Sequence, residues 1–170
     1  MKKLILSTSI IVLTAASANA ECANITKDEV IAAQTKWGTG IVEIGKSDNP
    51  SVRAQKHLDD LYAYDLGEVL FKPTKAADDQ FRGTEEEALS YFVTGIVPED
   101  KGFALAPYTK VRFENEGITI DCDSALAMGN YYFTTTEGNE IKVEYSFGYI
   151  EDKDGNLKIN LHHSSLPYKN

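Results

Sequence analysis

The spacing of apolar residues changes once along this 170-residue chain, and that change most constrains its fold. In three stretches between Thr26 and Gly95 the apolar residues recur at spacings of three and four, which is typical of amphipathic helices. From Tyr108 onward they alternate with polar residues, as strands do, and the segment 140–150 alternates cleanly. Helices followed by a run of strands predict an α+β domain in which a curved antiparallel sheet wraps around the longest helix.

Three helices are predicted before this change, because each has a recognisable start. Thr26 and Thr84 are each followed three residues later by glutamate, the pattern of a capping box, and Asn49 precedes a proline at a first helical position. An apolar stripe behind Thr26 predicts one long helix. A short strand is expected in "GEVLFKPT", residues 67–74, ending at Pro73.

Four strands are predicted after the change, over about 108–120, 123–135, 140–150 and 156–166. One face of 123–135 carries Ala127 and Gly129, whose small size predicts a modest cavity between sheet and helix for a small ligand. The other face carries Leu126 and Met128, so both faces of this strand are apolar. A second apolar face predicts that another subunit covers the sheet, and we expect a homodimer.

The N-terminus is typical of an exported protein. Lys2 and Lys3 precede an apolar run to about Ala16, and the small residues of Ala18-Asn19-Ala20 form a cleavage pattern, so residues 1–20 are interpreted as a signal peptide. The apolar run is too short to span a membrane. We expect residues 21–170 to form a single domain without a membrane span, in the periplasm of a Gram-negative bacterium.

Charge and cysteine content narrow the classes of partner. Without Lys2 and Lys3 the 17 basic residues fall to 15, against 26 acidic residues, which gives a formal charge of −11. Such a chain repels phosphate backbones, so we do not expect nucleic-acid binding. The two cysteines, Cys22 and Cys122, are predicted to form a disulfide in an oxidising compartment.

The stretch "LKINLHHSS", residues 157–165, holds the polar residues of greatest interest. Alternation counted from Leu157 places His163 and Ser165 on the apolar inner face, unless a bulge inverts the count. An inward histidine and serine beside a cavity can be a base and a hydroxyl of a reaction site, although a core histidine bonded to a backbone carbonyl is an alternative. The neighbouring His162 points the other way in a regular strand, so the two histidines cannot share a metal ion.

Five stretches of the sequence together carry a resemblance to a known family. "LYAYDLGEVLFKPTKA", "ALSYF", "VRFENEGI", "ALAMGNYYFT" and "LHHSSLPY" occur in this order over nearly the whole predicted mature chain. This set resembles the iota-class carbonic anhydrases, and more narrowly the branch that ends in HHSS and works without a metal or other cofactor. The resemblance implies a nuclear transport factor 2-like cone, usually dimeric, and a reaction between carbon dioxide and bicarbonate.

The same resemblance implies four site residues: Thr74 after the short strand, Tyr91 on the third helix, and His163 with Ser165. Tyr91 also falls on the predicted buried face of its helix. Thr74 is three residues from the inward Phe71, so in a regular strand its side chain would point to the opposite face. We expect a water held by Ser165 and Tyr91 to attack carbon dioxide while His163 receives the proton. Thr74 and Tyr91 would hold the oxygens that become bicarbonate.

Two other functions remain open from the sequence. One is a non-catalytic periplasmic module that binds a small apolar ligand. The other is a proton-moving isomerase of the same fold, which would need an inward carboxylate as its base. No carboxylate interrupts the apolar positions of 140–150 or 156–166, so the isomerase ranks third.

Overall fold

The computed structural model describes residues 25–169. The predicted signal peptide, residues 1–20, and Cys22 lie outside the described residues. Cys122 lies within them, in the short turn between two strands. Among residues 25–169, no helix combines the length and apolar character needed to cross a membrane.

The helices begin where the sequence predicts. They are α1 (Lys27–Lys46), α2 (Pro50–Leu61), α3 (Glu85–Val93) and a short 3-10 helix η1 (Phe103–Leu105). Thr26 and Thr84 each form a complete capping box, which satisfies backbone groups at the starts of α1 and α3. The Asn49 side chain accepts a hydrogen bond from the backbone of Val52 at the start of α2.

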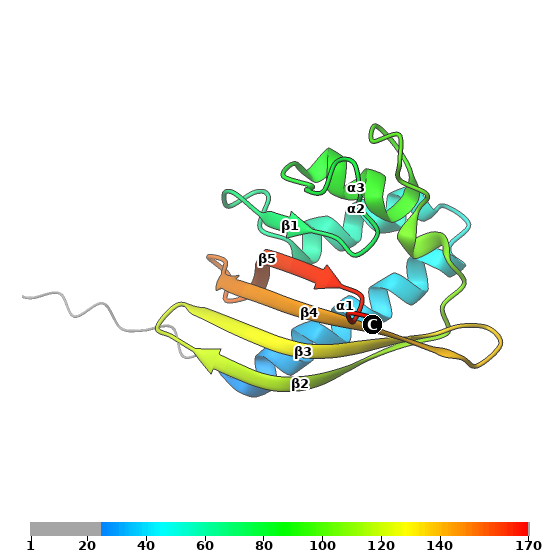
Figure 1. Cartoon of the computed structure of the whole chain (residues 1–170). Helices are drawn as coiled ribbons and strands as arrows, with labels where there is room; N and C mark the ends of the chain where they lie inside the picture. Colours follow the sequence, from blue (N-terminus) through cyan, green and yellow to red (C-terminus); the bar gives the residue numbers. More distant parts are fainter. Residues whose placement is uncertain (1–24, 170) are drawn as a thin grey trace, which may run out of the picture.

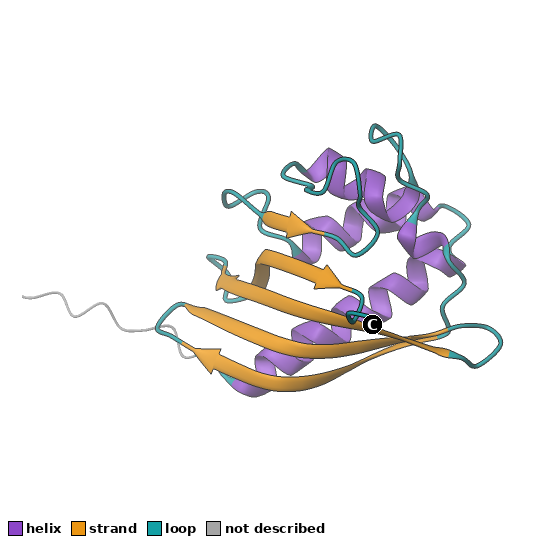
Figure 2. Cartoon of the chain, in the orientation of Figure 1, coloured by secondary structure: helices purple, strands orange, loops and turns teal. Residues whose placement is uncertain are grey.

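The strands form one mixed sheet with the order β1-β5-β4-β3-β2. They are β1 (Leu70–Lys72), β2 (Lys110–Ile120), β3 (Ser124–Thr134), β4 (Glu140–Glu151) and β5 (Leu157–Ser165). Strands β2 to β5 form the predicted antiparallel meander, whereas β1 pairs in parallel with β5. Figure 2 shows the strands on one side and the helices on the other.

The core lies between the sheet and the helices. Helix α1 crosses one face of the sheet, and α2 and α3 lie at the β1 end (Figure 1). The inward stripe of α1 buries Trp37, Ile41 and Ile44 completely or almost so. This is the predicted α+β architecture.

Gly129 does not open the cavity that its small size predicted. Strand β2 has a bulge between Asn115 and Gly117, opposite Gly129. A Cβ on Gly129 would overlap the carbonyl oxygen of Glu114, so glycine is required by the close approach of the β2 backbone.

Candidate functional site

Strand β5 carries one more residue than its partner β4 along the same length. Gly148 pairs with Leu161, but the next residue, Tyr149, pairs with Ile159, so Asn160 is a β-bulge. Because side chains alternate along a strand, one extra residue moves every later side chain to the opposite face.

His162 and Ser164 are therefore the inward pair. Each is 2% exposed, whereas His163 is exposed and Ser165 is half-buried. The prediction that His163 and Ser165 face the interior is wrong, because the count from Leu157 assumed a regular strand.

The hydroxyl groups of Thr74 and Ser164 form the polar end of the site. Their oxygens lie 2.8 Å apart, and either hydroxyl can donate. Thr74 follows β1, whose parallel pairing with β5 brings this loop to the end of the HHSS stretch. The structure thus brings Thr74 to a serine of that stretch, as the resemblance implied, but the serine is Ser164. Burial raises the pKa of the nearby Tyr131 hydroxyl, and interactions with Ser164 and Thr74 oppose that rise.

Tyr91 lies on the buried face of α3, as predicted. Its ring stacks on Phe103 with centroids 5.3 Å apart and meets the edge of Phe71 at 5.7 Å. The backbone N–H of Lys75, the residue after Thr74, donates to its oxygen at 3.4 Å. Burial raises the pKa of Tyr91, so its hydroxyl keeps its proton at neutral pH and can donate it to an oxygen ligand.

His162 lies among aromatic rings. Phe71 stacks on it at a centroid distance of 4.5 Å, and Phe147 and Trp37 meet it at 4.2 and 5.5 Å. Its Nδ1 is 2.8 Å from the hydroxyl of Tyr62. Burial holds the pKa of His162 well below its usual value, so the imidazole is neutral.

Three aromatic residues of this site were missed by the sequence reasoning. Trp37 belongs to the predicted buried stripe of α1, and Tyr131 to the inward face of β3, so both were assigned to the core alone. Tyr62 immediately follows α2 and lies in the quoted "LYAYD" stretch. Only the tertiary contacts show that their polar atoms meet the site.

A cavity of about 290 Å³ opens beside Tyr91. Its lining includes Lys75 and Phe103, and the acidic residues Glu99 and Asp100. Asp100 is buried and forms an ion pair of 2.6 Å with the guanidinium of Arg82, so it is not a free inward base. This pairing leaves the proposed isomerase chemistry without its carboxylate here.

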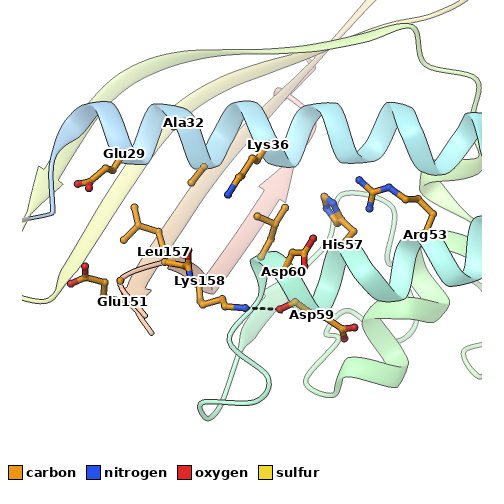
Figure 3. Close-up of a pocket in the computed structure, with 14 residues that line it drawn as sticks. Glu29, Ala32, Lys36, Arg53, His57, Asp59, Asp60, Glu151, Leu157 and Lys158 are labelled. Carbon is orange, nitrogen blue, oxygen red and sulfur yellow. Dashed lines mark hydrogen bonds between the residues drawn. The ribbon is translucent and has the colours of Figure 1, made fainter. Parts of the chain in front are cut away.

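A larger cavity of about 520 Å³ lies between α1, α2 and the β4–β5 turn, away from the predicted residues (Figure 3). Charges of both signs line it, among them Lys36 and Glu151, and Lys158 donates to the backbone oxygen of Asp59 at 2.5 Å. His57 lies at its wall. Although charged residues flank His57 in the sequence, it does not lie on a solvated helix face: it is 1% exposed, and burial lowers its pKa to about 3.

No group of three or more histidine, cysteine, aspartate or glutamate side chains that could hold a metal ion occurs within residues 25–169. The two adjacent histidines point to opposite faces of β5, as expected.

Comparisons with known proteins identify relatives over nearly the whole described chain. Residues 28–166 match the family model for metal-independent carbonic anhydrases. The chain is 43% identical over 155 residues to a metal-independent carbonic anhydrase of Nostoc sp. strain PCC 7120, covering 85% of this chain and 75% of that protein.

Two solved structures extend the comparison. The crystal structure of a cyanobacterial iota-carbonic anhydrase complexed with bicarbonate has a TM-score of 0.84 and 38% identity, covering 97% of this chain and 100% of that chain. A nuclear transport factor 2-like superfamily protein from Salmonella enterica serovar Typhimurium has a TM-score of 0.51 and 12% identity, covering 84% and 92%. The second likeness concerns the fold alone.

Proposed function

The chain belongs to the metal-independent carbonic anhydrase family, and we propose that it interconverts carbon dioxide and bicarbonate beside the paired hydroxyls of Thr74 and Ser164. The observation that carries this proposal is the hydroxyl pair itself, which lies where an apolar, aromatic interior meets polar groups. Carbon dioxide is apolar and bicarbonate is charged, so a site for both needs the two surfaces side by side.

The aromatic rings and the hydroxyls have separate tasks. The rings of Phe71 and Phe147 form an apolar wall beside His162 that excludes water and admits carbon dioxide. Hydroxyl groups on Ser164 and Tyr91 donate to the oxygens on which negative charge develops.

The hydroxyl pair also offers a path for the proton of the attacking water. Ser164 can accept that proton while the pair passes its own proton to an oxygen of carbon dioxide. The product is carbonic acid, which loses its proton to solvent as bicarbonate leaves, so the reaction balances. His162 takes up no proton in this scheme, because burial disfavours its charged form.

Two lysines lie at the same end of the site. The ammonium group of Lys72 is 3.4 Å from the backbone oxygen of Ser164, and that of Lys75 is 6.0 Å from the centre of the Phe103 ring. In a chain of net charge −9, these cations favour the approach of bicarbonate to the cavity beside Tyr91.

Matched serine variants test this function. We expect Ser164→Ala to lower kcat/KM for carbon dioxide hydration by about 10²-fold, the scale of one general acid–base group. Ser165→Ala should change it little, because the Ser165 hydroxyl bonds to Glu144 at 3.1 Å on the exposed side. The measurement is stopped-flow hydration, with and without dipicolinate. A loss of activity with the chelator that zinc restores, or no activity in the unmodified protein, contradicts the proposal.

Export and a disulfide are further proposals, supported by the signal-like residues 1–20 and the cysteine pair Cys22 and Cys122. We expect the mature protein in the periplasm, with the cysteines joined. Titration of the denatured, unreduced protein should find no free thiol. Two thiols per chain would contradict the disulfide.

A further inference from the structure

Three buried polar groups form a chain that ends at His162. The indole nitrogen Nε1 of Trp37 donates to the hydroxyl oxygen of Tyr62 at 2.9 Å. The same oxygen is 2.8 Å from Nδ1 of His162. All three side chains are at most 2% exposed, so water does not replace these bonds.

The direction of these bonds follows from what each group can donate. An indole nitrogen only donates, so the Tyr62 oxygen must accept the bond from Trp37. Among residues 25–169, Nδ1 of His162 is the only acceptor within reach of the Tyr62 hydroxyl proton. The hydroxyl therefore donates to Nδ1, which must carry no proton.

The opposite arrangement leaves a buried donor without a partner. If Nδ1 carried the proton, the Tyr62 oxygen would accept two bonds, and both its own hydroxyl proton and the lone pair of Nε2 would lack a partner. With the proton on Nε2, that N–H is the one group of the three residues left unpaired. Leaving such a group unsatisfied is unfavourable. The chain of bonds thus selects one tautomer of a neutral imidazole.

We propose that Trp37 and Tyr62 are positioning residues that hold His162 as the neutral tautomer with its proton on Nε2, so that His162 donates a hydrogen bond to a substrate oxygen and does not act as a base. Nε2 is buried and has no hydrogen-bond partner in the described part of the protein. It is thus a donor available to a ligand, on the same strand face as Ser164. The identity of that ligand as carbon dioxide or bicarbonate rests on the proposed function.

This assignment makes chemical sense of a histidine placed among aromatic rings. A base in such a site would become a buried cation, which burial disfavours. A neutral N–H donor costs no charge and can stabilise negative charge that develops on oxygen during hydration. A second group that fixes the tautomer of a working imidazole is common among functional histidines.

The first test reads the tautomer without substrate. Long-range proton–nitrogen NMR of the nitrogen-labelled protein at neutral pH should show Nδ1 of His162 as unprotonated and Nε2 as protonated. The signals are assigned by their absence in His162→Gln. An imidazolium, or a proton on Nδ1, would overturn the proposal even if every other variant failed to fold.

A matched pair of variants tests the role of Tyr62. In Tyr62→Phe the Nδ1 signal of His162 should move toward the value averaged over both tautomers. The kcat should fall several-fold, while KM changes less. Tyr64→Phe removes a hydroxyl from the neighbouring stacked ring, 6.0 Å away, which donates to the backbone oxygen of Arg82 instead. It should leave the His162 nitrogens unchanged. Unchanged nitrogens in Tyr62→Phe would overturn the proposal.

The two conclusions can fail separately. If the unmodified protein hydrates no carbon dioxide but shows the Nε2–H tautomer, the proposed function fails and the tautomer assignment stands. If it is active and His162 is protonated on Nδ1, the function stands and the positioning role is wrong.

Discussion

His162 and His163 are neighbours in sequence, yet their surroundings have nothing in common. His162 is enclosed by the rings of Phe71 and Phe147, while His163 is exposed on the outer face of the sheet. The difference comes from Asn160, the extra residue in β5. One residue in the strand thus decides which imidazole can touch a substrate.

Replacing each histidine by glutamine in turn shows which of the two contributes to carbon dioxide hydration. We expect His162→Gln to lower kcat/KM for hydration by about 10²-fold, the scale seen when one preorganised donor is lost. His163→Gln should stay within a few-fold of the unmodified protein. Stopped-flow rates, with thermal unfolding to show that both variants are folded, decide this. An inactive His163→Gln beside an active His162→Gln would contradict the bulged register.

Buried histidines also make stability depend on pH. His57 has its pKa lowered from 6.5 to about 3 in the folded protein, and that of His162 is lowered as well. Below about pH 6.5 the unfolded chain binds protons that the folded chain does not, so stability falls as pH falls. For His57 the loss at pH 5 is about 2 kcal/mol.

Urea unfolding at pH 7 and pH 5 tests this dependence. The free energy of unfolding of the unmodified protein should fall between the two values. In His57→Gln the fall should be smaller by about 2 kcal/mol. Carboxylates titrate mainly below about pH 5. Both proteins contain the same carboxylates, so their contribution to the fall in unfolding free energy is the same in each. An equal fall in both proteins would show that His57 is not buried in neutral form.

At the scale of the elements, the loop that follows β1 matters most for the site, because it carries Thr74. Backbone N–H groups of Ala77, Asp78 and Asp79 donate to the carboxylate of Glu99 at 3.0 to 3.2 Å. These bonds, first of all that from Asp78, lower the pKa of Glu99. The Glu99 carboxylate therefore ties the loop to the segment after α3.

Removing that carboxylate should loosen the loop. In Glu99→Ala we expect faster amide hydrogen exchange over residues 75–83 and a several-fold lower kcat/KM, because Thr74 is no longer held against Ser164. Glu86→Ala, at an exposed position of α3, is the matched control and should change neither. Unchanged exchange in Glu99→Ala would mean that Glu99 does not hold the loop.

At the scale of the whole molecule, the outer face of the sheet exposes apolar side chains. Leu126 and Met128 are 58% and 59% exposed on β3. Tyr132 continues this row and is half-buried, with the guanidinium of Arg112 3.8 Å from its ring centre. A row of this kind favours contact with a second copy of the chain, as the sequence predicts.

Sedimentation tests the homodimer. We expect the mature protein to sediment as at least a dimer at micromolar concentration and Met128→Glu to sediment as a monomer, since a charge would be buried in the contact. Val52→Glu, at an exposed apolar position of α2, should leave the assembly unchanged. A stable monomer of the unmodified protein would rule out the proposed dimer.

Local patterns were enough to predict most of the elements. The capping boxes at Thr26 and Thr84 and the alternation along β4 depend on residues a few positions apart, so the sequence shows them directly. The motifs that resemble the carbonic anhydrases likewise pointed to Thr74, which carries one of the paired hydroxyls, and to Tyr91, which accepts a bond from the backbone of Lys75, the residue after Thr74.

What the sequence determined by itself was the order and type of the elements, the family, and the residue types of the site. Only the tertiary structure decided which histidine and serine face the interior, because the bulge at Asn160 depends on how β5 pairs with β4. It also decided that Trp37 and Tyr62 form a chain of bonds to His162. Trp37 and Tyr62 are separated by 25 positions in the sequence, and Tyr62 and His162 by 100. Hydrogen bonds across such separations depend on how helices and strands pack, and no spacing along one element encodes them.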